Sequence, residues 1–313
     1  MGKNVSKSSL ARANQDRDYH IFEEYAYYLV SEARQKCANH IFKLGGNVYA
    51  FDSTTIDLCL SVFWWAKFRK KKGGIKVHTL YDVETQIPAF FHITEASVHD
   101  SKVMIEIPYE PSSYYIFDRG YSNFKMLYKI HQIEAYFVVR AKKNLGYKSI
   151  QWKRRLPKNV LSDASVLLTG FYPKQYYPEP LRLVKYWDEE QEREFIFITN
   201  AMHISALQVA ELYKNRWQVE LFFKWLKQHL KIKRFWGTTE NAVRIQIYAA
   251  ICAYCLVAII QHDMQLDRST YEVLQILSIS LTDKTYLRDL FNKTKFQNDK
   301  ERFGPNGPSL FNF

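Results

Sequence analysis

The sequence has 313 residues, 47% of them apolar and 16% aromatic, which is enough to bury a substantial core in one large domain or two smaller ones. Its 44 Lys and Arg residues outnumber its 32 Asp and Glu residues, and the formal net charge of +12 favours a polyanionic partner such as nucleic acid or an anionic membrane surface. Residues 1–20 lack the apolar core of a signal peptide, which argues against secretion and predicts a cytoplasmic location.

The first predicted elements are helices followed by strands. Apolar residues at helical spacing within residues 9–40 predict one or two amphipathic helices, in an N-terminal helical segment that we place at residues 1–44. Three strand-like segments follow at residues 47–58, 74–83 and 87–94, separated by turn or basic stretches. We expect these strands to form a meander.

A fourth strand is predicted to end on Asp118, after a polar stretch that should lead into a helix. Ser122 then caps a predicted helix, and residues 135–143 form a fifth strand. The order strand, strand, strand, helix, strand, helix, strand is that of the ribonuclease H-like fold, a mixed sheet with helices on its faces. By this analogy we predict an α/β protein whose core begins with residues 45–141.

The second half of the sequence changes character twice. Tyr-, Pro- and Lys-rich pieces with turn signals predict a β-rich insertion at residues 142–200, which interrupts the core. Ser205 then caps a long amphipathic helix that carries Glu220, within a segment at residues 201–238. Residues 239–313 are predicted to form a helical C-terminal part that ends in a polar tail.

The most apolar stretch, residues 245–260, is shorter than the ~20 residues that cross a bilayer and is interrupted by Gln246. We therefore predict a buried core helix and no membrane partner. Cys252 and Cys255 form a CxxC pattern in this stretch, with no second pair of metal ligands nearby. Packed thiols in a reducing cytoplasm are the favoured interpretation over a zinc or redox site.

Three carboxylates form a candidate metal site. Asp52 lies in the first strand and Asp118 ends the fourth, and the two meet if these strands lie side by side. Glu220, on the later helix, can close the cluster. Hard divalent cations prefer such oxygen ligands, and two Mg²⁺ ions held there would flank a scissile phosphate. Each Asp taken alone is more often a turn or capping residue.

Basic residues on the same helix predict DNA contacts. Tyr213, Arg216, Glu220 and Lys227 recur at helical offsets, so a single helix would carry all four on one face. Arg216 and Lys227 could bind DNA phosphates while Glu220 binds a metal ion. Ordinary charge pairing on a solvent-exposed helix face is the simpler alternative.

Two basic runs elsewhere are candidate phosphate contacts. Residues 67–76 include Lys70, Lys72 and Lys76, and they lie between the first two predicted strands, close to the expected active edge. Residues 141–155 interleave basic and aromatic side chains. A solvated charged surface is the alternative for both runs.

The string from Tyr213 to Lys227 reads Tyr-x2-Arg-x3-Glu-x6-Lys and resembles the signature of the insertion-sequence-four family of DDE transposases. The resemblance covers most of residues 45–260. It extends to the segments FDSTTIDL, KGGIKVHTLYD, TEASVHDSKVM, FDRGY, ITNAMHISALQVAELYKNRW and WGTTENAVRIQIYAAI.

This resemblance implies a ribonuclease H-like catalytic core, an inserted β-domain between the second Asp and the Glu, and excision and insertion of a mobile element. It implies dependence on Mg²⁺, for which Mn²⁺ can substitute. The implied partner is double-stranded DNA, bound by a homodimer in a synaptic complex in the bacterial cytoplasm. The implied metal ligands are Asp52, Asp118 and Glu220.

The resemblance also implies roles in DNA binding. Tyr213, Arg216 and Lys227 would contact phosphates of the element's end. Trp217 would stack on a nucleotide flipped out near the cleavage site, with a core Trp as an equal alternative. His99 matches a family position near the site and could contact DNA or water, although a helix-capping Asp100 beside a polar His is the more economical account.

Members of this family normally carry a further N-terminal helical domain that recognises the terminal repeats, and we expect this sequence to begin just after it. A second hypothesis is therefore a truncated, inactive DNA-binding fragment that pairs with full-length transposase and inhibits it. A host ribonuclease H-like nuclease is a weaker third hypothesis. The intact Tyr-Arg-Glu-Lys string argues against it, and inverted repeats around the reading frame would favour a mobile element.

Overall fold

The computed structural model describes residues 6–38, 41–69, 72–229, 235–268, 270–280 and 285–293. The helices are α1 (Lys7–Asp16), α2 (Tyr19–Lys36), α3 (Phe124–Gln132), α4 (Phe171–Tyr176), α5 (Ala206–Lys214), α6 (Trp217–His229), α7 (Glu240–Asp263), α8 (Thr270–Ser280) and α9 (Leu287–Lys293), with 3-10 helices η1 (Asp100–Glu106) and η2 (Arg119–Tyr121). The strands are β1 (Val48–Leu58), β2 (Lys67–Arg69), β3 (Lys72–Asp82), β4 (Ile87–Glu95), β5 (Tyr114–Phe117), β6 (Tyr136–Arg140), β7 (Tyr147–Trp152), β8 (Val160–Leu168), β9 (Leu181–Asp188) and β10 (Arg193–Thr199).

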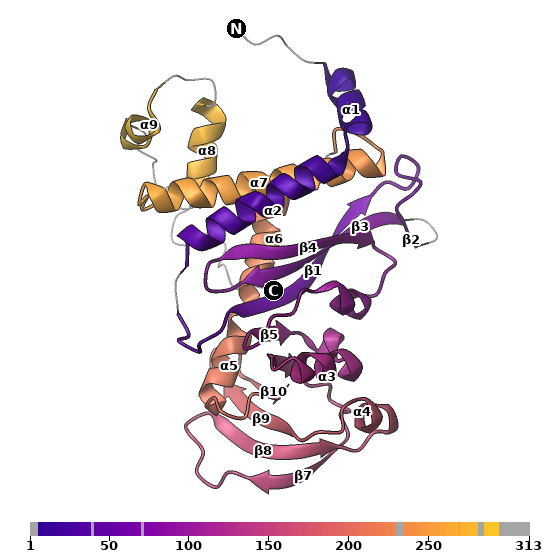
Figure 1. Ribbon diagram of the computed structural model, residues 1–313, viewed down its shortest axis with the longest axis vertical. Helices are drawn as coiled ribbons and strands as arrows, with labels where there is room; N and C mark the ends of the chain where they lie inside the picture. Colours follow the sequence, from indigo (N-terminus) through magenta and orange to yellow (C-terminus); the bar gives the residue numbers. More distant parts are fainter. Residues whose placement is uncertain are drawn as a thin grey trace.

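The strands form one mixed sheet in the order β2-β3-β1-β5-β6-β10-β9-β8-β7, with β4 paired to β3. β5 runs parallel to β1 and to β6, and the remaining pairings are antiparallel. The molecule is elongated: α1, α2 and α7–α9 lie at one end and β7–β10 at the other (Figure 1). The prediction of an α/β protein with a mixed sheet and helices is confirmed.

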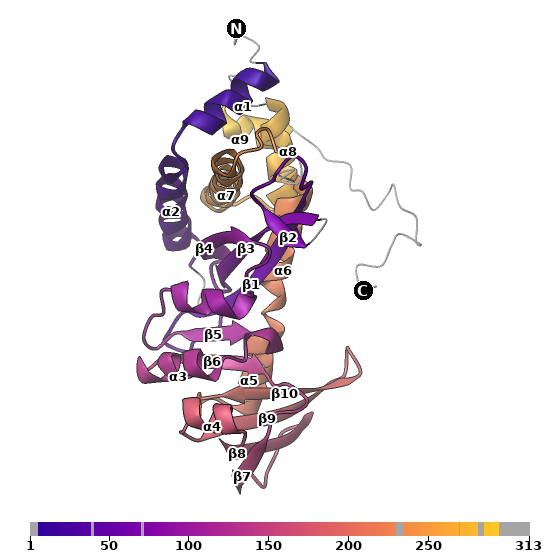
Figure 2. The same ribbon diagram turned by 90° about the vertical axis from the view of Figure 1, so that its right-hand side faces the viewer.

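Alternation along the central strands divides the core between the two faces of the sheet. Val48 and Ala50 of β1 belong to a cluster with residues of α2, α5, α6 and α7, whereas Tyr49 and Phe51 belong to a second cluster with α3 and η1. Successive side chains of a strand point to opposite faces, so a strand covered on both sides is apolar throughout. Figure 2 shows α6 on one side of the sheet and α3 and α4 on the other. Helices therefore pack on both faces of the central strands.

Strands β7–β10 lie within the predicted β-rich insertion at residues 142–200. β10 pairs with β6 through the register Phe197 to Arg140, and β9, β8 and β7 follow outward. These strands therefore continue the central sheet instead of forming a sheet of their own.

The single long helix predicted from Ser205 is wrong, because the structure has two helices there. Ser205 caps α5 with a capping box, as expected, but α5 ends at Lys214 and α6 starts at Trp217. The amides of Arg216 and Val219 bond three residues back, to Tyr213 and Arg216, which is the tighter 3-10 pattern. The Asn215 side chain donates to the Glu211 carbonyl and competes with regular helical bonding.

The polar stretch before β5 forms the 3-10 helix η1 and no α-helix. The apolar stretch at residues 245–260 lies inside α7, which is longer than the stretch itself. By length and composition α7 could cross a membrane, but half of its most apolar window is buried and α2 packs along it (Figure 1). Cys252 and Cys255 are buried free thiols in this helix, and burial raises the pKa of Cys252 to about 11.

Candidate active site

Pairing of β1 with β5 brings the first two predicted carboxylates together. The two strands run parallel with Phe51 opposite Phe117, and each of these buried residues is followed by an Asp. Asp52 and Asp118 therefore lie next to each other at the point where β5 ends. The expectation that the first and fourth predicted strands lie side by side is confirmed.

Arg216 joins the third predicted carboxylate to the first. Its Nη1 donates to Asp52 Oδ2 at 2.7 Å and its Nη2 donates to Glu220 Oε1 at 2.6 Å. Glu220 lies in the first turn of α6, and Arg216 immediately precedes that helix. The three side chains are partly buried, so water screens their interactions only in part.

Two tyrosine hydroxyls and one backbone amide donate hydrogen bonds to the aspartates. The Tyr213 hydroxyl donates to Asp118 Oδ1 at 3.0 Å, and the Tyr121 hydroxyl donates to Asp52 Oδ1 at 3.4 Å. The Ser53 amide also donates to Asp52 Oδ1, at 2.8 Å. Four of the predicted residues, from three separate parts of the chain, therefore meet around one point: Asp52, Asp118, Tyr213 and Arg216, with Glu220 reached through Arg216.

Burial dominates the electrostatics of Asp52. The pKa of Asp52 is raised to about 6, chiefly by burial. Arg216 and the Ser53 amide oppose this rise, whereas repulsion from Glu220 and Asp118 contributes to it. Burial alone would lower the pKa of Arg216, but Asp52 and Glu220 raise it overall. Arg216 is thus charged and compensates a crowded group of carboxylates.

The three carboxylates are chemically suitable ligands for a hard divalent cation. Asp52, Asp118 and Glu220 offer only carboxylate oxygens, which Mg²⁺ prefers. Across the described part of the chain, however, no three His, Cys, Asp or Glu side chains are grouped closely enough to hold a metal ion. Arg216 lies between Asp52 and Glu220 and supplies the positive charge in this arrangement.

The other predicted DNA-binding residues differ in their surroundings. Trp217 is 54% exposed at the start of α6, so the alternative of a core Trp is wrong. Lys227 is partly buried on the same helix. Lys70 lies outside the described residues, and only the backbone of Lys72 is described, in β3.

Lys76 supports the site from within instead of lying on the surface. Its Nζ pairs with Asp100 at 3.0 Å and donates to the Val98 carbonyl at 2.8 Å. Asp100 also accepts from the Ser53 hydroxyl at 2.8 Å, and Ser53 is the residue whose amide bonds to Asp52. In this arrangement Lys76 is only 13% exposed, and its charge is paired with that of the partly exposed Asp100.

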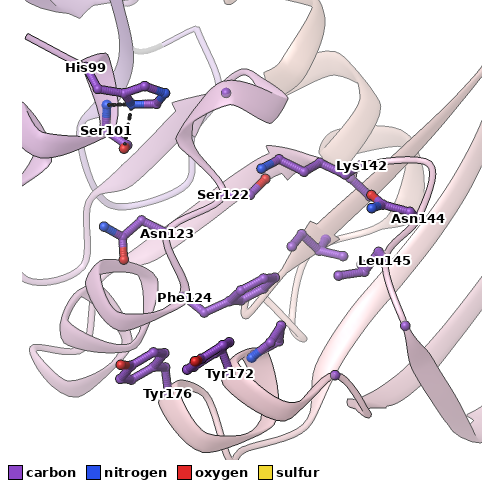
Figure 3. A pocket seen from close by; sticks show the side chains of 16 residues that line it. His99, Ser101, Ser122, Asn123, Phe124, Lys142, Asn144, Leu145, Tyr172 and Tyr176 are labelled. Carbon is purple, nitrogen blue, oxygen red and sulfur yellow. Dashed lines mark hydrogen bonds between the residues drawn. The ribbon is translucent and has the colours of Figure 1, made fainter.

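His99 is exposed and caps η1, where its Nδ1 accepts from the Ser101 amide. The expected capping role of Asp100 is therefore wrong, because His99 takes the cap and Asp100 turns to Lys76 and Ser53. His99 lies at the rim of a hollow of about 520 Å³ between η2, α3, α4 and the segment after β6. In Figure 3, Phe124, Tyr172 and Tyr176 gather on one side of this hollow and Lys142 on another.

Sequence reasoning missed Ser53, Asp100 and Tyr121 as parts of the site. Each is next to a predicted residue or motif, since Ser53 follows Asp52, Asp100 follows His99, and Tyr121 closes the FDRGY segment. Adjacency alone did not separate them from turn residues, because the bonds Ser53–Asp100, Asp100–Lys76 and Tyr121–Asp52 join segments that are distant in sequence.

Comparison with known proteins identifies the family. The family model described as "Transposase DDE domain" matches residues 43–256, so the chain belongs to this family. It is 36% identical over 246 residues to a candidate transposase of Sinorhizobium fredii, y4zB, over 76% of this chain and 67% of that protein. It is 27% identical over 249 residues to a candidate transposase for insertion sequence element IS5377 of Geobacillus stearothermophilus, over 80% of this chain and 66% of that protein.

A third relative is a candidate transposase for insertion sequence element IS4SA of Synechocystis sp., at 25% identity over 306 residues, 92% of this chain and 83% of that protein. The chain spans about two thirds of the length of the first two relatives. The expected identity as a DDE transposase is confirmed at the level of the family.

Proposed function

We propose that this chain catalyses metal-dependent cleavage and strand transfer of DNA at the ends of a mobile insertion element, as a member of the insertion-sequence-four group. The observation that carries the proposal is the meeting of Asp52 and Asp118 on adjacent parallel strands, with Glu220 joined to Asp52 through Arg216. Membership of the DDE domain family supports it, and the relative named for IS4SA supports the finer grouping.

The proposed core is ribonuclease H-like. The strand order and the two parallel pairings around β5 support this assignment. We retain the five-part division of the chain as a proposal: 1–44 helical, 45–141 core, 142–200 β-rich insertion, 201–238 bearing Glu220, and 239–313 C-terminal helical region.

Asp52, Asp118 and Glu220 are the proposed ligands of two divalent cations, Mg²⁺ or Mn²⁺. Such ions activate water or a 3′-hydroxyl and stabilise the leaving oxygen in phosphoryl transfer. The other residues orient DNA: the Arg216 fork matches a phosphate, and Tyr213 and Lys227 are further proposed phosphate contacts. Exposed Trp217 is available to stack on an unpaired base.

The proposed partners are double-stranded DNA and a second copy of the chain in a synaptic complex, in the bacterial cytoplasm. The net charge of +12 supports a DNA partner. A second candidate function is a non-catalytic DNA-binding fragment that inhibits a longer transposase. It is favoured by the ion pairs of Arg216 with Asp52 and Glu220, which engage two of the three carboxylates.

Substitution of the two aspartates separates these functions. Asp52→Asn and Asp118→Asn should each reduce cleavage of a duplex carrying the DNA that flanks the reading frame by at least ~100-fold, because a neutral amide holds a divalent cation poorly. Non-specific DNA binding should persist, since phosphate contacts remain. Asp57→Asn is the matched control, because Asp57 is an exposed carboxylate on the same strand. Cleavage that survives either aspartate substitution removes that residue from the proposed site.

A further inference from the structure

The Arg216 guanidinium takes the position between two proposed metal ligands. Two of its nitrogens donate to Asp52 and Glu220 at 2.7 and 2.6 Å. Its third nitrogen, Nε, is buried and has no hydrogen-bond partner within the described structure. The side chain is therefore anchored through the two carboxylates, and a buried donor is left unsatisfied, which is a costly arrangement unless another partner supplies an acceptor.

The third proposed ligand is also engaged by the same segment. Tyr213 donates to Asp118 Oδ1 at 3.0 Å, only three residues before Arg216. Carboxylate oxygens that accept these bonds are the ones that a divalent cation would need, and the guanidinium charge repels such a cation. The segment from Tyr213 to Arg216 therefore competes with metal at all three carboxylates.

The segment lies where the helix is irregular. α5 ends at Lys214 and α6 begins at Trp217, and the amides between them bond three residues back. Arg216 is thus carried by a short 3-10 turn, where a small backbone change redirects a side chain more easily than inside a regular α-helix. Beside it, Trp217 is exposed, so this turn reaches the surface.

We propose that Arg216 is an internal cation that occupies the carboxylates in the absence of DNA, and that a DNA phosphate draws it away and thereby raises their affinity for divalent metal. The inference rests on the proposed function, because it takes Asp52 and Glu220 as metal ligands. A phosphate suits this exchange, since the planar guanidinium bonds to it in a bidentate manner and its oxygens can satisfy Nε. Linkage is reciprocal, so metal must raise DNA affinity by the same factor, typically about 5-fold to 150-fold.

The first test measures Mn²⁺ affinity of the full chain without DNA, from the paramagnetic resonance signal of free Mn²⁺. Arg216→Met should bind Mn²⁺ at least ~5-fold more tightly than the wild type, and Arg216→Lys should lie between them, because one ammonium cannot bridge both carboxylates as the fork does. Arg244→Met is the matched control, since Arg244 forms a similar i,i+4 pair with Glu240 at the start of a different helix, α7. It should leave Mn²⁺ affinity unchanged.

The second test measures affinity for a labelled pre-cut duplex from the flanking DNA, at constant ionic strength, with and without Mn²⁺. Mn²⁺ should tighten DNA binding by the wild type and have little effect on Arg216→Met. Circular dichroism of both substituted proteins checks that they are folded, and Arg216→Lys carries the comparison if Arg216→Met is not.

The outcomes separate the inference from the proposed function. Two results overturn the inference and leave the carboxylates as metal ligands. In the first, Arg216→Met binds Mn²⁺ more weakly than the wild type; in the second, both proteins bind Mn²⁺ equally and DNA does not change the Mn²⁺ affinity of either. Absence of Mn²⁺ binding in every protein, with and without DNA, overturns the proposed function and the inference together.

Discussion

His78 is a fully buried titratable side chain one strand away from Asp52. It stands on β3 opposite Ser53, its Nε2 lies 2.9 Å from Thr94 Oγ1, and its Nδ1 has no hydrogen-bond partner within the described structure. The pKa of His78 is lowered to about 4, chiefly by burial, while Asp100 opposes the shift and Lys76 contributes to it. The side chain is therefore neutral in the folded protein at neutral pH.

This burial predicts an acid sensitivity that belongs to His78. Because its folded-state pKa lies below the unfolded value of about 6.5, the unfolded chain takes up the proton first as the pH falls. The free energy of unfolding should fall by about 3 kcal/mol between about pH 7 and about pH 4 on this account. Urea titrations of the wild type and His78→Gln should differ in this pH dependence. An identical pH dependence in His78→Gln would show that His78 is not held neutral.

The positions of single residues were predictable where the adjacent sequence determines them. Asp52 and Asp118 each follow a short apolar run that indicates a strand. The prediction that they meet therefore depended on one assumption, that these two strands, β1 and β5, pair with each other. The surroundings of Lys76 were not predictable, since its partner Asp100 comes from a segment beyond the next strand, β4. A basic run looks the same in sequence whether one of its members faces DNA or pairs with a carboxylate of the same protein.

A buried ion pair ties β8 and β9 to the start of α5. Arg182 donates through two nitrogens to both oxygens of Asp163, each at 2.8 Å, and also to the carbonyl of Ile204. Both side chains are almost fully buried. Arg182 and the exposed Lys153 hold the pKa of Asp163 below its usual value against the effect of burial.

Removal of one partner should therefore destabilise this part of the sheet. Asp163→Ala should lower the free energy of unfolding by ~3–5 kcal/mol, because it leaves the Arg182 charge buried without its partner. The exposed pair Lys158–Glu189 provides the control, and Lys158→Ala should cost no more than ~1 kcal/mol. Denaturant titration measures both. A loss below about 1 kcal/mol in Asp163→Ala would mean that water reaches Arg182 and compensates its charge.

Elements were predictable from periodicity, and their interruptions were not. The alternating and apolar runs correctly indicated the strands around Asp52 and Asp118, and Ser205 correctly indicated a helix start. The break at Asn215 was missed because its cause is a side chain that bonds to its own helix backbone, in a stretch with strong helical periodicity. Arg216 lies directly at that break.

At the scale of the molecule, the central sheet runs from the helical end to β7, with the candidate site near the middle (Figure 1). The second predicted phosphate-binding run begins just after β6, and Lys142 and Lys143 are exposed there. Lys142 also lines the hollow below the loop that follows Asp118 (Figure 3). A DNA strand that leaves the candidate site on this side would meet these lysines.

Salt dependence of binding measures their contribution. Each lysine that neutralises a phosphate adds about 0.9 to the slope of log affinity against log salt, so the double variant Lys142→Ala with Lys143→Ala should reduce that slope by up to ~2. Fluorescence anisotropy with a labelled duplex gives the slope. Lys158→Ala is again the control, since Lys158 is paired with Glu189 in the turns that join the outer strands. An unchanged slope in the double variant would place the DNA elsewhere.

The central claim is that Glu220 belongs to a DNA-cutting site, and cleavage tests it most directly. A labelled duplex carrying the flanking DNA is incubated with Mg²⁺ and either the wild type or Glu220→Gln, and strand breaks and binding are measured in parallel. We predict that the wild type cuts at the element's end and leaves a 3′-hydroxyl, while Glu220→Gln binds the duplex but does not cut it. Equal cleavage by both proteins, or binding without cleavage by the wild type, would contradict the claim.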